Sequence, residues 1–192
     1  MRKLSALFIL FCFALQVAAQ QNPVKWLRQS SISPDGQTIA FAWQGDIFTV
    51  NINGGEAKQL TSHPSHESNP LWTADGKEVI FSSEREGTAD LWAVSAEGGT
   101  PRRITTYNGS EKPIAVGPDG TIYFTSNIQY DVNYSNFPNT PQLYSVSQSG
   151  GKIRQVTSLP ISNLSINASG VMLYEDRKGV EDPLCKHHTS SV

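Results

Sequence analysis

Short apolar segments alternate with glycine-containing turns along most of the chain. Each of three copies has an Asp-Gly turn, an apolar segment, a second apolar segment, a Gly-Gly pair and an aliphatic residue followed by threonine. The final pairs of the three copies are Leu60-Thr61, Ile104-Thr105 and Val156-Thr157. Because Pro, Asp and Gly in these orders suit tight turns between strands, each copy predicts two β-hairpins and therefore four short strands.

The spacing of these landmarks indicates the architecture. The first glycine of the Gly-Gly pair precedes the aliphatic residue by 6 positions in all three copies, and the pairs recur after 44 and 52 residues. Such periods are typical of the ~40 to 50 residue blades of β-propellers. A fourth copy begins at Asn167–Gly170 and continues through Val171–Tyr174 without a second half. We therefore predict an all-β fold, an incomplete β-propeller with three four-stranded blades and a truncated fourth.

Adjacent large apolar residues within one segment support a sheet that is covered on both faces. Leu91 and Trp92 follow each other in the second copy. Because successive side chains of a strand point to opposite faces, both faces of this sheet must be buried. A blade that is stacked between two neighbouring blades meets this requirement.

The first 19 residues have the pattern of a secretory signal peptide. Arg2 and Lys3 precede the apolar run Leu4–Ala14, and the small residues Val17-Ala18-Ala19 offer a cleavage site. An uncleaved N-terminal anchor is the other interpretation, although the run is short for a stable membrane span. We predict a periplasmic or secreted protein with no stable span after cleavage.

Residues 20–192 are predicted to form the partial β-propeller. The repeat places blade one at about 27–61, blade two at about 67–105, blade three at about 111–157, half blade four at about 162–176 and a tail at 177–192. Closed propellers have ~4 to 8 blades, so we expect the front part of something longer, or a truncated remnant of it. The open blade edges are expected to favour self-association.

Cysteine content limits the disulfides that residues 20–192 can form, and charge limits the kinds of partner that they can bind. Without residues 1–19 the chain has 13 basic and 17 acidic side chains, and Cys185 is its single cysteine. An intrachain disulfide is then excluded, and the acidic balance argues against nucleic acid or an anionic membrane surface as a partner. Peptides or proteins of the cell envelope are the partners that we predict.

The repeats resemble those of a known group of proteins. The pattern Ser33–Gly36, Gly45–Phe48 and Gly54–Thr61 is similar to the propeller repeats of TolB and of the tricorn-type serine peptidases, and the second copy has the same pattern. The segment Trp26–Arg28 and the stretch from Tyr174 to Ser191 resemble the exported tricorn-type peptidases in particular.

The resemblance implies a role without catalysis in this part of the chain. Tricorn-type enzymes cleave peptides with a serine nucleophile assisted by a histidine, in domains downstream of the first propeller. The resemblance implies that the propeller filters or guides peptide substrates. Two alternatives are a TolB-like periplasmic protein-binding propeller fragment and a truncated gene product with no independent function.

Candidate catalytic and metal-binding residues are better explained by the repeat. His63 and His66 lie in a Pro-containing connection without further ligands at metal-binding spacing, and Ser149–Lys152 matches a Ser-x-x-Lys motif only through a hairpin turn. Asp46 and Asp90 occupy matching positions, which favours a role in holding each blade together. We predict no catalytic, cofactor-binding or metal-binding residue in the chain, and no cofactor.

The third copy contains an insertion of mixed aromatic and amide residues between its two middle segments. Loops of this kind often carry recognition, and Tyr and Asn suit peptide contacts. A plain insertion without function is the other interpretation. The candidate recognition residues are Tyr130, Asn133, Tyr134, Asn136 and Phe137.

Overall fold

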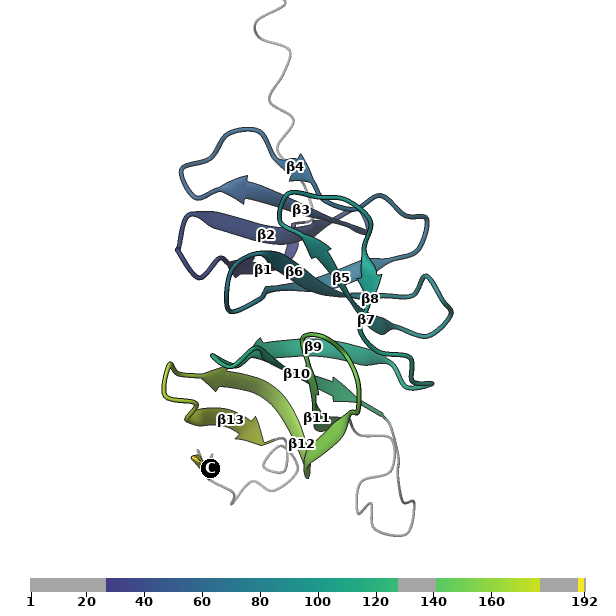
Figure 1. The fold of residues 1–192 in the computed structure, drawn as a ribbon, viewed down its shortest axis with the longest axis vertical. Coiled ribbons are helices and arrows are strands. Elements are labelled where there is room, and N and C mark those ends of the chain that lie inside the picture. Colours follow the sequence, from purple (N-terminus) through teal and green to yellow (C-terminus); the bar gives the residue numbers. More distant parts are fainter. Residues whose placement is uncertain (1–26, 128–140, 177–189, 192) are drawn as a thin grey trace, which may run out of the picture.

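The computed structural model describes residues 27–127, 141–176 and 190–191, and all the regular elements in these ranges are β-strands. The strands form antiparallel sheets that follow one another along the long axis of the molecule (Figure 1). We call these sheets blades. The all-β propeller fold with an incomplete set of blades is confirmed.

The first two blades have four strands each, in sequence order. Blade one contains β1 (Arg28–Ile32), β2 (Thr38–Trp43), β3 (Asp46–Asn51) and β4 (Lys58–Gln59). Blade two contains β5 (Glu67–Trp72), β6 (Glu78–Ser83), β7 (Asp90–Ser95) and β8 (Arg102–Arg103).

The third and fourth blades share one strand. Blade three contains β9 (Glu111–Val116), β10 (Thr121–Ser126), β11 (Gln142–Ser147) and the first part of β12 (Arg154–Ile166), and blade four contains the rest of β12, β13 (Met172–Asp176) and β14 (Ser190–Ser191). Glu111, the first residue of blade three, follows Thr105 by six positions, but the equivalent Ile161 follows Thr157 by only four. The shorter connection leaves no room for a loop, so the backbone continues as one strand.

The Gly-Gly pair fixes the outer hairpin of each blade. In blade one Gly54 and Gly55 have φ angles of +87° and +116°, which residues with a Cβ atom rarely adopt. The threonine that follows closes the hairpin, because the Oγ1 atom of Thr61 accepts a hydrogen bond of 2.9 Å from the amide of Ile47. Thr105 accepts the same bond from Leu91 at 2.9 Å, so the outer hairpins of blades one and two close in the same way.

The core lies between the blades rather than within a single sheet. Phe81 and Trp92 pack with residues of blade one, whereas Ile80 and Leu91 pack with Ile122 and other residues of blade three. The prediction that Leu91 and Trp92 face opposite sides of their sheet is therefore confirmed.

Candidate functional site

The inner edges of the four blades line a single groove. β1, β5 and β9 are edge strands that lie side by side, and the second part of β12 lies next to β9. Together they enclose a cavity of about 430 Å³, which we call the inner groove. Its lining residues are Gln29, Ser30, Asn69, Pro70, Leu71, Lys112, Pro113, Ile114 and Ser162–Ser165.

Each inner strand is irregular where it lines the groove. The pairing register shifts at Gln29 in β1, between Ser68 and Leu71 in β5, opposite Tyr123 in β9 and between Ile161 and Asn163 in β12. Such β-bulges redirect side chains and are over-represented at sheet edges and next to active sites.

Two of these irregularities place residues other than glycine in the left-handed region. Gln29 and Asn69 have φ angles of 47° and 53°, and each precedes the glycine of its Asp-Gly turn by seven residues. Such a conformation costs ~1 to 2 kcal/mol. The amide of Asn69 donates a hydrogen bond of 3.1 Å to Oε1 of Gln29, which links the two bulges across the blades.

The chemistry of the inner groove is that of hydroxyl and amide groups with one cation. Its polar residues are mostly Ser, Asn and Gln, and Lys112 is the ionisable residue among the described lining residues. Hydroxyl and amide groups can both donate and accept hydrogen bonds, as a polypeptide main chain requires. Within residues 27–127, 141–176 and 190–191, no group of three or more His, Cys, Asp or Glu could hold a metal ion.

The repeated residues at the start of the third strand of each blade bond to the neighbouring fourth strand. Gln59 donates to Asp46 at 3.0 Å, and Arg103 donates to Asp90 at 2.6 Å. In blade three Gln155 makes the equivalent bond of 2.6 Å to Gln142. The predicted structural role of Asp46 and Asp90 is confirmed.

The histidine and Ser-x-x-Lys candidates lie in turns. Nδ1 of His63 accepts a hydrogen bond of 3.1 Å from the amide of Ser65, and Nδ1 of His66 lies 3.2 Å from the carbonyl oxygen of Glu67. Gly150 has a φ angle of +85° and donates to Ser147 at 2.8 Å, as the hairpin interpretation of Ser149–Lys152 requires. The candidate recognition residues Tyr130, Asn133, Tyr134, Asn136 and Phe137 lie outside the described residues.

A set of buried acidic residues, which the sequence pattern did not predict, lies at one end of the strands. Glu67 and Glu111 are the first residues of β5 and β9, and both are almost fully buried, as is Asp90. Arg85 pairs with Glu67 and stacks 4.5 Å above the ring of Trp92. The signal in the sequence is that each Glu follows the threonine of its preceding blade by six residues.

Burial changes the ionisation of Glu111. The Oγ1 atom of Thr105 donates a hydrogen bond to this carboxyl group, and this bond lowers its pKa by less than burial raises it. Burial, assisted by the nearby charge of Asp90, raises the pKa of Glu111 to about 7. Burial also raises the pKa of Asp90 above its ordinary value, against the opposing effect of Arg103. The hydrogen bond between Thr105 and Glu111 links the end of blade two to the start of blade three.

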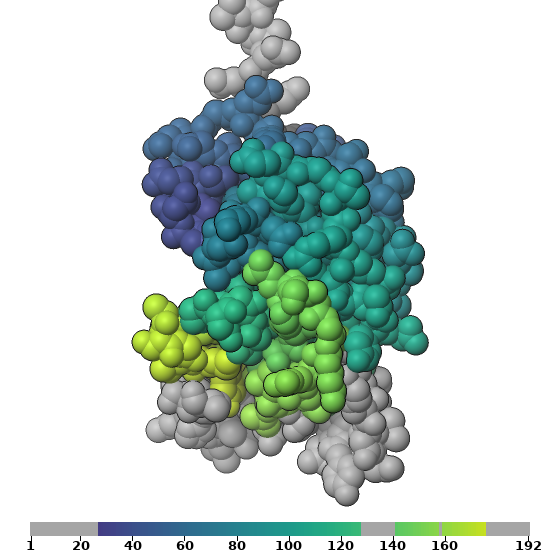
Figure 2. Space-filling view, viewed as in Figure 1, coloured from purple at the N-terminus to yellow at the C-terminus, as the bar shows by residue number. Residues whose placement is uncertain are grey.

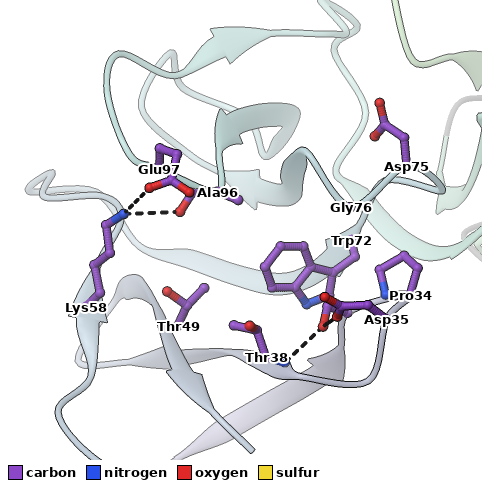
Figure 3. A pocket seen from close by; sticks show the side chains of 11 residues that line it. Pro34, Asp35, Thr38, Thr49, Lys58, Trp72, Asp75, Gly76, Ala96 and Glu97 are labelled. Carbon is purple, nitrogen blue, oxygen red and sulfur yellow. Dashed lines mark hydrogen bonds and ion pairs between the residues drawn. The ribbon is translucent and has the colours of Figure 1, made fainter.

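A second cavity, of about 450 Å³, lies between blades one and two (Figure 3). Nζ of Lys58 in blade one lies 3.4 Å from the carbonyl oxygen of Ala96 and 3.2 Å from Oε2 of Glu97, both in the Gly-Gly turn of blade two. Trp72 donates its indole N–H to the carbonyl oxygen of Ser31 at 3.3 Å. We call this cavity the blade socket, since contacts across it hold the two blades together.

Known proteins share this architecture. The chain is 32% identical to dipeptidyl-peptidase 5 of Porphyromonas gingivalis over 113 residues. This match covers 53% of the chain and 16% of that relative. A putative TolB from Agrobacterium tumefaciens has a TM-score of 0.58 at 24% identity, over 72% of this chain and 50% of the other. The tricorn protease structure has a TM-score of 0.61 at 20% identity, over 78% of this chain and 15% of the other. These two structural likenesses concern the fold.

The chain spans about a quarter or less of the length of the curated relatives that it matches. Residues 24–191 match the tricorn protease N-terminal beta propeller domain, which is nearly all of the chain. The chain therefore belongs to the family of tricorn protease N-terminal β-propeller domains.

Proposed function

We propose that this chain is the propeller part of an exported tricorn-type peptidase and that it guides peptide substrates along its inner groove. The observation that carries the proposal is the inner groove itself, where four irregular inner strands bring hydroxyl and amide groups together beside Lys112. Proteolysis belongs to other parts of such an enzyme, and the propeller contributes selection and guidance. The family and the peptidase among the relatives support the assignment.

An extended peptide fits the groove chemically. A peptide in this conformation presents N–H and C=O groups along both sides, and the groove offers partners of both kinds. Lys112 adds one positive charge, which favours a peptide whose free C-terminal carboxylate reaches it. Recognition of the main chain with a single charged anchor gives broad specificity, as guidance of diverse peptides requires.

Binding of labelled peptides tests this proposal. A fluorescein-labelled decapeptide with a free C-terminus and the same peptide with an amidated C-terminus are titrated with the purified chain, and fluorescence anisotropy is recorded. We expect tighter binding of the free acid, and a roughly threefold to tenfold loss of that preference in Lys112→Gln. Lys77→Gln is the matched control, since Lys77 is exposed and does not line the groove.

The outcomes of this titration separate the alternatives. Absence of saturable binding, or equal binding by Lys112→Gln and the parent chain, would contradict peptide guidance by the groove. A chain that ignores the peptides but captures a folded envelope protein would instead support the TolB-like interpretation, which the TolB fold likeness favours.

Export is part of the same proposal. It rests on the basic, apolar and small-residue pattern of residues 1–19, which lie outside the described residues. Within the described ranges no helix could cross a membrane. Mass spectrometry of the protein from a fractionated producing cell should find a mature N-terminus near Gln20 in the envelope fraction, and a retained Met1 would contradict cleavage.

A further inference from the structure

The main-chain N–H of Asn69 lies outside the hydrogen-bond ladder of its own sheet. The pairing of β5 with β6 passes from Ser68 directly to Leu71. Asn69 and Pro70 therefore form a bulge, and both line the inner groove. Because proline has no N–H, Asn69 supplies the main-chain donor of this bulge.

The side chain of Gln29 covers this donor from blade one. Its Oε1 atom accepts the hydrogen bond of 3.1 Å from the amide of Asn69. The side chain of Asn69 is engaged elsewhere, since its Nδ2 atom donates to Oγ of Ser68 at 3.0 Å. Oε1 is a carboxamide oxygen, the same functional group as the carbonyl oxygen of a peptide. Gln29 therefore offers Asn69 the acceptor that a bound peptide main chain would offer.

The contact between Gln29 and Asn69 is suited to reversible opening. Gln29 is exposed, and its hydrogen bond with Asn69 is open to solvent. Water competes for such a bond and the long side chain loses rotamer freedom in making it, so its net contribution is small. Pro113, the equivalent of Asn69 in blade three, has no N–H, so the contact is not repeated between blades two and three. It therefore differs from the contacts of Thr61 and Thr105, which recur in successive blades.

Asn69 and Lys112 are placed to meet the same peptide. They lie in the neighbouring inner strands β5 and β9 and line the same cavity of about 430 Å³. Figure 2 shows a hollow on the left of the molecule, between the purple segment of blade one and the yellow-green segment of blade four, the first and last blades that line the inner groove. An extended peptide whose C-terminal carboxylate reaches Lys112 presents its earlier main-chain carbonyl groups along the neighbouring strand.

We propose that the main-chain N–H of Asn69 is a subsite for a carbonyl oxygen of the peptide main chain, and that the side chain of Gln29 occupies this subsite in the unliganded molecule. The inference rests on the proposed guidance of peptides by the inner groove. An incoming peptide displaces the carboxamide of Gln29 and takes over its hydrogen bond. Because the subsite reads the main chain, it accepts peptides with different side chains.

Titration of Gln29 variants with a labelled, amidated decapeptide without charged side chains tests the proposal, with fluorescence anisotropy as the readout. We expect Gln29→Ala and Gln29→Asn to bind about threefold to fivefold more tightly than the parent chain, since the subsite is no longer covered. Asparagine suits the left-handed conformation of this position, and its side chain is shorter. Gln29→Glu should bind more weakly at neutral pH, because an ionised carboxylate is a stronger acceptor for the N–H group. Gln37→Ala is the matched control, since Gln37 is an exposed residue of the same blade outside the groove.

The amide resonance of Asn69 gives a second readout by NMR. It should shift when the decapeptide is added to the parent chain, and when N-methylacetamide is added to Gln29→Ala. Asn69→Gly should keep the affinity for the decapeptide within about twofold, because the donor belongs to the main chain and glycine tolerates the left-handed conformation. Equal or weaker binding of the decapeptide by Gln29→Ala overturns this inference alone. If no variant binds the decapeptide, a shift of Asn69 by N-methylacetamide contradicts peptide guidance but supports the subsite, and the absence of that shift overturns both.

Discussion

Replacing Glu111 by glutamine tests whether a buried carboxyl group sets the pH dependence of stability. The side chain is 1% exposed at the start of β9, where Thr105 donates a hydrogen bond to it and Asp90 opposes its ionisation. Burial is the largest cause of the rise in its pKa from the ordinary 4.5 to about 7. The native state therefore holds a proton on Glu111 that the unfolded chain releases earlier as the pH rises.

The sign and size of the effect follow from this difference in pKa. Below pH 4.5 both states are protonated, and the stabilising contribution is fully present. As the pH rises from 4.5 to about 7 the unfolded chain loses its proton first, so the contribution is lost through this window. At ~1.4 kcal/mol per unit the free energy of unfolding falls by about 3 kcal/mol, which is a large part of the stability of a typical domain.

Urea denaturation between pH 4 and 9 measures this loss. We expect the free energy of unfolding of Glu111→Gln to fall less than that of the parent chain between pH 4.5 and 7, because glutamine keeps an acceptor for Thr105 and does not ionise. Above pH 7 the variant should be the more stable of the two by up to ~3 kcal/mol. Glu56→Gln, at an exposed site, is the control. Parallel pH profiles for Glu111→Gln and the parent chain would refute the reasoning.

Three further substitutions probe the packing and the turns, each followed by the urea midpoint. Phe81→Ala should lower the free energy of unfolding by ~3 to 5 kcal/mol, since the ring is fully buried between blades one and two, and a loss below ~1 kcal/mol would contradict this. Gly98→Ala should cost ~1 to 2 kcal/mol through its φ angle of +86° alone, because an added Cβ atom meets nothing within 4 Å. Arg102→Ala should cost ~1 to 2 kcal/mol through its bonds to Glu78 and the carbonyl oxygen of Gln148, and Arg102→Lys should restore part of it.

Local turn chemistry made the blades predictable from the sequence. Gly54-Gly55 and its equivalents have backbone angles that other residues rarely adopt, so the glycine pair by itself predicts the turn. The adjacent large apolar residues Leu91 and Trp92 likewise predict a sheet with two buried faces. These signals lie within a few residues of one another and need no knowledge of the neighbouring blades.

The features that depend on neighbouring blades were not predictable in this way. The bulge at Asn69 is linked to Gln29, 40 residues earlier, and nothing local to either residue indicates the hydrogen bond between them. The burial of Glu111 depends on the packing of blade three against blade two. β12 continues through Pro160, which would ordinarily suggest the end of a strand, because blades three and four are joined by a shortened connection.

Comparison of the copies separates residues that build the blades from residues that differ in each blade. Lys58 and Arg102 make the same contact in successive blades, so their chemistry is that of the scaffold. Along the inner groove the equivalent positions differ: seven residues before the glycine of the first turn, the four blades have Gln29, Asn69, Pro113 and Asn163. A scaffold contact repeats because every blade needs it, whereas a ligand meets each inner strand once and from a different direction. Variation around a common groove, with strained backbone at two of its positions, is therefore the reason to seek the function of this propeller at its inner strands.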